Sequence, residues 1–127
     1  VSTGYDTKRL QMILAVLEKR GGVQVRQSDV FVNVAGGIAV QDPAIDLGVA
    51  VAIASSVIDR PIPSGVAFVG ELGLTGEVRR VAYLDQRVGE AVCLGLEFIY
   101  APATVEAPSK HIVAVERLST VLSVLFK

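Results

Sequence analysis

The longest apolar segment of the sequence, AIDLGVAVAIASSVI at residues 44–58, places the strongest constraint on how this chain folds. Apolar residues fill nearly every position, so a helix formed here presents apolar side chains on almost all sides. The segment is long for a strand, and Pro43, directly before it, suits the first turn of a helix. The segment therefore predicts a helix that is buried on several sides and, being rich in small residues, closely packed.

An amphipathic helix is predicted in front of this segment. Asp6 can cap its start, and the glycines at 21–22 can end it. Between them, apolar residues recur at helical spacing at Leu10, Ile13, Leu14 and Leu17. Valines then alternate with other residues over 23–25 and 30–34, on either side of a polar turn at 27–29. This alternation predicts a hairpin of two half-buried antiparallel strands.

Strands and helices alternate in the second half of the sequence. The predicted strands cover 66–72, 77–84, 97–102 and 111–116, and the first two are joined through GLTG at 73–76. The predicted helices cover 85–96 and 117–126. This order predicts an α/β fold in which helices pack on a mixed sheet. The length of 127 residues fits a single domain over residues 1–127.

Composition limits the kinds of partner and site. The chain is 51% hydrophobic, yet its apolar runs are interrupted before the ~20 residues of a membrane span, so we expect buried strands or a subunit interface, and no membrane. Its net charge of -1 gives no overall attraction for nucleic acid, which leaves only a local basic patch. The single cysteine, Cys93, and the single histidine, His111, cannot assemble a zinc site, so no metal and a reducing compartment are expected. The first residues lack the apolar region of a signal peptide, and the chain reads as a domain of a longer protein.

Several familiar site motifs are missing. The sequence has no G-x-x-x-x-G-K-[ST] phosphate loop. Gly70, Gly73 and Gly76 lie between two predicted strands rather than between a strand and a helix, so they indicate turns and not a dinucleotide site. The hydroxyls of Ser55 and Ser56 are expected to bond the helix carbonyls one turn back, and His111 is expected to have a packing or surface role.

Three segments carry a family resemblance. PAIDLGVAVAIASSVIDRPIP, GELGLTGEVRRV and QRVGEAVCLGLEFIYAP resemble the C-terminal domain of the RadA (Sms) family of DNA repair proteins. That domain is itself similar to the proteolytic domain of Lon, so the resemblance implies a Lon-protease-like fold of the ribosomal-protein domain-2 kind. In the family the domain follows a zinc finger and an ATPase core. ATP, magnesium and zinc are implied for those parts, and no cofactor is implied for this one.

The resemblance also identifies the positions of a Ser/Lys protease dyad. The serine position falls on Ala44, which has no hydroxyl, and the lysine position falls on Arg87. A guanidinium does not give up its proton in a protein, so it cannot act as the base. No catalytic residue is therefore expected, and Asp42 or Asp46 is the expected partner of Arg87. The alternative is a Lon-like serine peptidase with residual or displaced catalytic residues, for which Thr75 and Ser64 offer hydroxyls without a base nearby.

Two roles follow from the resemblance and the arginines. The first is a scaffold that closes into a ring homo-oligomer, expected to be a hexamer, in an ATP-dependent protein of branch migration and homologous recombination. The second is a sequence-independent contact with single-stranded or branched DNA. Its candidate residues are Arg79 and Arg80, placed on opposite faces of one strand, with Arg87, Lys19, Arg20 and Arg26. The expected location is the bacterial cytoplasm, or an organelle if the host is a plant.

Overall fold

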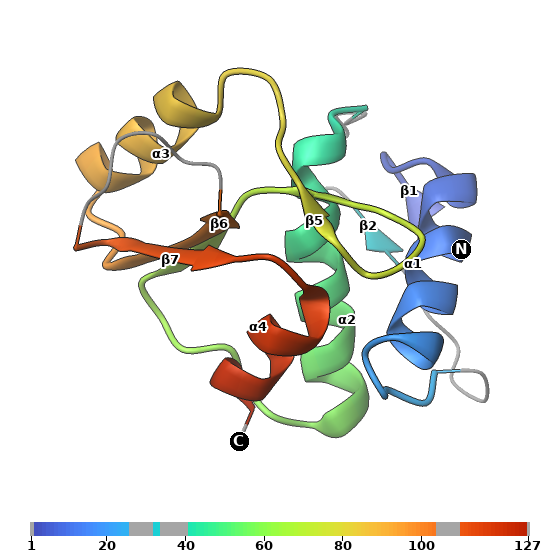
Figure 1. The fold of residues 1–127 in the computed structure, drawn as a ribbon. Helices are drawn as coiled ribbons and strands as arrows, with labels where there is room; N and C mark the ends of the chain where they lie inside the picture. The colour runs from blue at the N-terminus through green and yellow to red at the C-terminus, as the bar shows by residue number, and fades with distance from the viewer. Residues whose placement is uncertain (1, 26–31, 34–40, 104–109, 127) are drawn as a thin grey trace.

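A computed structural model describes residues 2–25, 32–33, 41–103 and 110–126 of the chain. Helix α2 (Asp46–Ile58) runs through the middle of the fold, with α1 (Thr7–Lys19) and α4 (Leu118–Leu125) packed on it (Figure 1). A turn of 3-10 helix, η2 (Pro43–Ile45), leads into α2, and Pro43 occupies its first turn. The apolar segment at 44–58 thus forms a central helix, as the sequence predicts.

The remaining elements follow from alternating apolar residues and from turns at glycine. In chain order they are β1 (Ser2–Thr3), β2 (Val32–Asn33), β3 (Val66–Phe68), β4 (Glu71–Leu72), β5 (Val78–Arg79), α3 (Leu84–Cys93), β6 (Phe98–Pro102) and β7 (Ile112–Val115). Strands β3, β6 and β7 form a parallel sheet in the order β3-β6-β7, and β1 pairs in parallel with β2. Strands β4 and β5 form a small antiparallel pair, so the mixed α/β class is confirmed.

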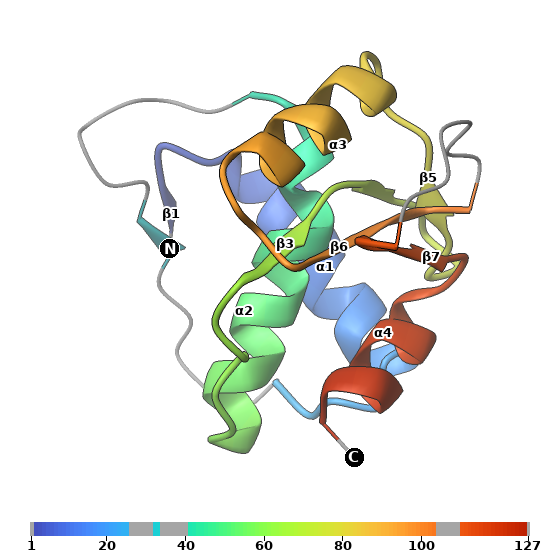
Figure 2. The same cartoon turned by 90° about the vertical axis from the view of Figure 1, so that its left-hand side faces the viewer.

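The three-stranded sheet has helices on both faces. Seen from the side, α3 lies over one face, while α2 and α4 lie below the other (Figure 2). Side chains alternate between these faces along β6: Ile99 and Ala101 join a cluster with α3, and Tyr100 joins the larger cluster around α2. Because both faces are covered, the strands are apolar at successive positions instead of alternating apolar with polar.

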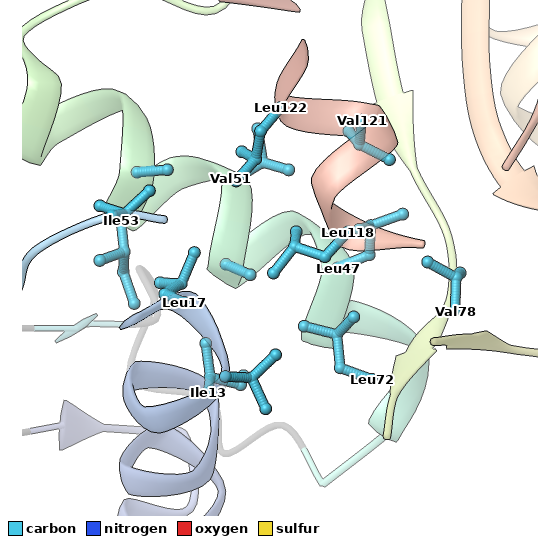
Figure 3. Close-up of a cluster of buried hydrophobic side chains, with 14 of the residues drawn as sticks. Ile13, Leu17, Leu47, Val51, Ile53, Leu72, Val78, Leu118, Val121 and Leu122 are labelled. Carbon is cyan, nitrogen blue, oxygen red and sulfur yellow. The ribbon is translucent and has the colours of Figure 1, made fainter. Parts of the chain in front are cut away.

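The larger core is formed where three helices meet the β4–β5 pair. Ile13 and Leu17 of α1, Leu47 and Val51 of α2, and Leu118 and Leu122 of α4 converge there (Figure 3). Leu72 and Val78 close the cluster from the strand pair. Leu17, Leu47 and Leu118 are fully buried. This packing fixes where α2 begins relative to the β4–β5 pair.

The structure corrects the hairpin that the sequence predicts over residues 23–34. Residues 23–25 are not a strand, because the Val23 amide donates to the Leu17 carbonyl at 3.0 Å and so completes the C-terminal cap of α1. Strand β2 pairs in parallel with β1 instead of turning back on residues 23–25. The polar turn predicted at 27–29 lies outside the described residues.

Other boundaries also differ from those predicted. The strand predicted over 66–72 is divided into β3 and β4, with Gly70 between them, and the strand predicted over 77–84 ends at Arg79. Helix α3 ends at Cys93, where Leu94 and Gly95 begin the turn into β6.

Within the described ranges, no helix has both the length and the apolar character needed to cross a membrane.

Candidate functional site

One carboxylate joins the start of α2 to the start of α3. Oδ1 of Asp42 accepts a hydrogen bond from the Ala44 amide at 3.0 Å. The other oxygen, Oδ2, pairs with Nη1 of Arg87 at 2.7 Å. Ala44 and Arg87, the two positions that the resemblance assigns to a Ser/Lys dyad, therefore both bond the Asp42 carboxylate.

Arg87 also holds the turn that precedes its own helix. Its Nε donates to the Ala82 carbonyl at 2.8 Å, and its amide donates to the Tyr83 carbonyl at 3.0 Å. Tyr83 has a left-handed backbone, with φ of 58°, at the N-cap of α3. The pKa of the Asp42 carboxyl lies below its usual value. The hydrogen bond from the Ala44 amide is the largest cause, and the Arg87 guanidinium adds to it, while burial acts in the opposite direction. Arg87 thus fastens two loops together.

Ala44 lies inside the core rather than at the floor of an open site. It is 4% exposed and belongs to the same apolar cluster as Leu84 and Val88 of α3. The Gly70 amide donates to the Ala44 carbonyl at 2.9 Å, and the Leu47 amide donates to the Gly70 carbonyl at 3.1 Å. The segment between β3 and β4 therefore fixes the position of Ala44 through the backbone. What stands there is a buried methyl group.

Asp46, the alternative partner expected for Arg87, is engaged elsewhere. It is fully buried in the first turn of α2. Its Oδ1 accepts from the Tyr5 hydroxyl at 2.7 Å and from Nε of Arg9 at 3.1 Å, and its Oδ2 accepts from the Leu72 amide at 3.2 Å and pairs with Nη2 of Arg9. Burial, followed by the hydrogen bond to Asp46, raises the pKa of the Tyr5 hydroxyl. Asp46 thus ties α1, α2 and β4 together.

The sequence analysis missed Tyr5 and Arg9, although one signal for them exists. Asp46 is the sole charged residue of the 44–58 segment, and a charge in a helix buried on several sides needs partners. That argument requires a donor but does not say which one. Arg9 is also 3.5 Å from Glu71, so it belongs to a small charge cluster rather than a single pair.

The candidate DNA contacts do not form one patch on a strand. Because β5 ends at Arg79, Arg80 lies outside the strand, so the prediction that one strand carries both residues is wrong; both side chains are exposed. Arg79 pairs with Glu77 at 3.0 Å. The pKa of the Glu77 carboxyl is lowered to about 2. The largest cause is the hydrogen bond from the Thr75 hydroxyl, and the Arg79 guanidinium is a smaller one. Arg79 and Arg87 thus both have carboxylate partners, since Arg87 pairs with Asp42.

The remaining candidates lie near the end of α1 or outside the described residues. Lys19 is in the last turn of α1, and Arg20 is its C-cap; both are exposed. Arg26 lies outside the described residues. The arginines are therefore distributed over the end of α1, the region after β5 and the start of α3.

The Ser55 hydroxyl and the His111 ring contact backbone carbonyls. The Ser55 hydroxyl donates to the Arg60 carbonyl beyond the helix end, not to a carbonyl one turn back as predicted. Nδ1 of His111 lies 3.0 Å from the Glu97 carbonyl oxygen. Cys93 is exposed. Within the part of the chain that the structure describes, no group of three or more His, Cys, Asp or Glu residues is arranged to hold a metal ion.

Comparison with known proteins identifies the family. The family model described as subunit ChlI of Mg-chelatase matches residues 6–104. "DNA repair protein RadA" of Listeria monocytogenes serovar 1/2a is 44% identical over 127 residues, and its namesake in Streptococcus pneumoniae (strain ATCC BAA-255 / R6) is 52% identical over 101 residues. The chain belongs to the RadA family. The ChlI model covers most of the chain, so the chain also belongs to the family described as subunit ChlI of Mg-chelatase.

The chain corresponds to only part of its RadA relatives. The matches cover 96% of the chain but 28% of the Listeria protein, and 80% of the chain but 24% of the Streptococcus pneumoniae protein. RadA of Streptococcus pyogenes serotype M1 is 44% identical over 98% of the chain and 29% of its own length. The chain thus spans about a quarter of the length of the curated relatives it matches.

Proposed function

We propose that this chain is a non-proteolytic, Lon-like scaffold domain of a DNA repair protein of the RadA kind. The observation that carries the proposal is the site at Ala44, Asp42 and Arg87. A methyl group that is 4% exposed stands where a nucleophile is needed, and a guanidinium paired with a carboxylate stands where the base is needed. Neither group can take part in acyl transfer.

The position of Arg87 supports a structural role for the former dyad. A lysine amine at that position donates from one nitrogen, whereas the guanidinium donates from Nη1 to Asp42 and from Nε to the Ala82 carbonyl at the same time. The bonds join the loop before α2 to the turn before α3. In this account, residue 87 maintains the geometry of the domain and carries out no reaction.

Assembly is the activity proposed for the domain. The chain is 51% hydrophobic, and some of its large apolar side chains are not buried. Leu74, Tyr83 and Leu94 are 74%, 71% and 73% exposed. Large apolar side chains of this kind are suited to contacts with further copies of the chain. We propose a closed ring of the chain, a hexamer, that organises the ATP-dependent parts of a protein active in branch migration. Sequence-independent DNA contact through the exposed arginines is a second, compatible part of the proposal.

A peptidase assay with a stability measurement tests the central site. We expect no turnover of casein or a fluorogenic peptide by the chain or by Arg87→Ala. The variant should instead lose about 1 kcal/mol of unfolding free energy, because the side chains of Arg87 and Asp42 are 32% and 39% exposed and their pairing is screened by water.

Arg87→Lys is the matched control for this assay, because it keeps the charge but loses the second donor direction. Its unfolding free energy should lie between that of the wild type and that of Arg87→Ala. Turnover that disappears in Arg87→Ala while the fold is kept contradicts the proposal and favours a displaced peptidase site.

A further inference from the structure

A small polar hollow lies beside the β4–β5 turn. It has a volume of about 210 Å³ and is lined by Arg20, Thr75, Gly76, Arg117 and Ser119. These residues come from the end of α1, the β4–β5 turn and the start of α4. A volume of this size holds several water molecules, each of which takes ~30 Å³ in the liquid. It therefore has room for a small hydrated anion.

The walls of the hollow are tied together by the backbone. The Leu118 amide donates to the Gly76 carbonyl at 2.9 Å, and Glu77 forms an antiparallel bridge with Arg117. Gly76 has φ of +82°, and a Cβ added there would lie 3.0 Å from the Cβ of Arg20. Glycine thus allows both the turn and the close approach of Arg20. The lining residues are held in place by contacts that need no ligand.

The hollow is lined by two guanidinium groups, those of Arg20 and Arg117. In the described ranges, neither Arg20 nor Arg117 pairs with a carboxylate, and Arg117 makes a long 3.4 Å contact with the Thr75 carbonyl. Glu77, which follows Gly76 in the sequence, accepts from the Thr75 hydroxyl and amide and pairs with Arg79. Its charge is therefore already matched by Arg79, and the lining itself carries two guanidiniums and no carboxylate.

We infer that this hollow binds a phosphate oxyanion. Guanidinium groups match phosphate oxygens with two parallel hydrogen bonds, and the Ser119 hydroxyl adds a further donor. Arg20 and Arg117 supply the charge and Thr75 lines the rim. The inference does not rest on the scaffold role of Asp42, Ala44 and Arg87, because none of these residues lines the hollow; Arg20 is shared with the proposed DNA contact, which the inference deepens. The phosphate can come from a free ion or from a nucleic-acid backbone.

The first arm of the test uses inorganic phosphate as the probe. Thermal unfolding is followed in phosphate and in chloride at equal ionic strength, for the wild type and for Arg20→Gln/Arg117→Gln. Lys8→Gln/Lys110→Gln removes the same charge at two exposed positions that are not candidate DNA contacts, and is the matched control. Phosphate should stabilise the wild type and the control, and its apparent affinity should fall about tenfold or more in the hollow variant, which loses charge-assisted hydrogen bonds.

The second arm uses a labelled oligo(dT) strand and separates the two phosphate sources. If the source is a nucleic-acid backbone, the hollow variant should flatten the salt dependence of binding by ~0.7 for each lost phosphate contact, and the control should flatten it less. If the salt dependence is unchanged but the phosphate effect is lost, the hollow takes a free phosphate group.

Some outcomes overturn the inference. They are the absence of a phosphate-specific effect in the wild type, and an equal loss in both double variants, which indicates diffuse charge. Ser119→Ala guards against a folding artefact, because it removes one donor without disturbing the backbone frame. It should weaken phosphate binding by a smaller factor, and unchanged binding in Ser119→Ala together with a misfolded double variant also overturns the inference.

Discussion

Asp46→Ala is the substitution to which the fold should be most sensitive among the charged residues discussed above. The carboxylate is fully buried and accepts hydrogen bonds from Tyr5, Arg9 and the Leu72 amide. Alanine removes the acceptor for all of them at once. It also removes a negative charge from the first turn of α2, where the helix dipole favours one.

The size of the effect follows from which donors lose their partner. The Tyr5 hydroxyl and the Leu72 amide are buried, and an unsatisfied buried donor costs about 1–3 kcal/mol. The Arg9 side chain is 28% exposed and lies 3.5 Å from Glu71, so water and Glu71 partly replace what it loses. Breaking a buried pair costs about 3–5 kcal/mol. We therefore expect a loss of about 4 kcal/mol, a large share of the total stability of a small domain.

Chemical denaturation followed by circular dichroism measures this loss. Asp85→Ala is the matched control, because Asp85 also lies in the first turn of a helix but is exposed. The control should lose less than about 1 kcal/mol. An Asp46→Ala variant that loses no more than Asp85→Ala would refute the reasoning, since it would mean that the buried contacts contribute nothing to the fold.

Two further predictions concern the β4–β5 turn. Gly76→Ala should be more destabilising than Gly95→Ala: both glycines have positive φ, which costs alanine about 1–2 kcal/mol, but only at Gly76 does the new Cβ meet Arg20, at 3.0 Å. Equal losses in a denaturation experiment would contradict the contact. Thr75→Val should raise the pKa of the Glu77 carboxyl from about 2 toward its usual value of 4.5, as followed by NMR titration, because the Thr75 hydroxyl is the largest cause of the lowered pKa. In the wild type this carboxylate stabilises the fold above pH 4.5, and the contribution is lost as the pH falls toward 2. A pKa of 4.5 for Glu77 in the wild type would remove the basis for that pH dependence.

Local patterns in the sequence account for the helices and for much of the sheet. The all-round apolar segment with Pro43 in front predicts α2, and the spacing of Leu10, Ile13 and Leu17 predicts α1. The glycines between 70 and 76 predict a turn, and β4 and β5 pair across it. These features depend on a few neighbouring residues, so they can be recognised without knowing the tertiary contacts.

Features that depend on distant contacts could not be predicted in the same way. Asp46 needs a partner, yet its donors Tyr5 and Arg9 are 41 and 37 residues away in the sequence. Val23 and Val25 alternate as a strand does, but the end of α1 and the core determine their conformation. The parallel pairing of β1 with β2 likewise joins distant segments. The polar hollow beside Arg20 arises from three separate elements and has no sequence motif.

Absolute mass in solution is the most direct test of the scaffold account. Light scattering over a range of concentrations, on the chain and on a full-length RadA-family protein that contains it, compares the observed mass with the 13.4 kDa of one chain. The account predicts a closed assembly of several copies for the full-length protein, and a mass that rises above 13.4 kDa for the chain as its concentration increases. A strictly monomeric mass for both proteins at every concentration would contradict it.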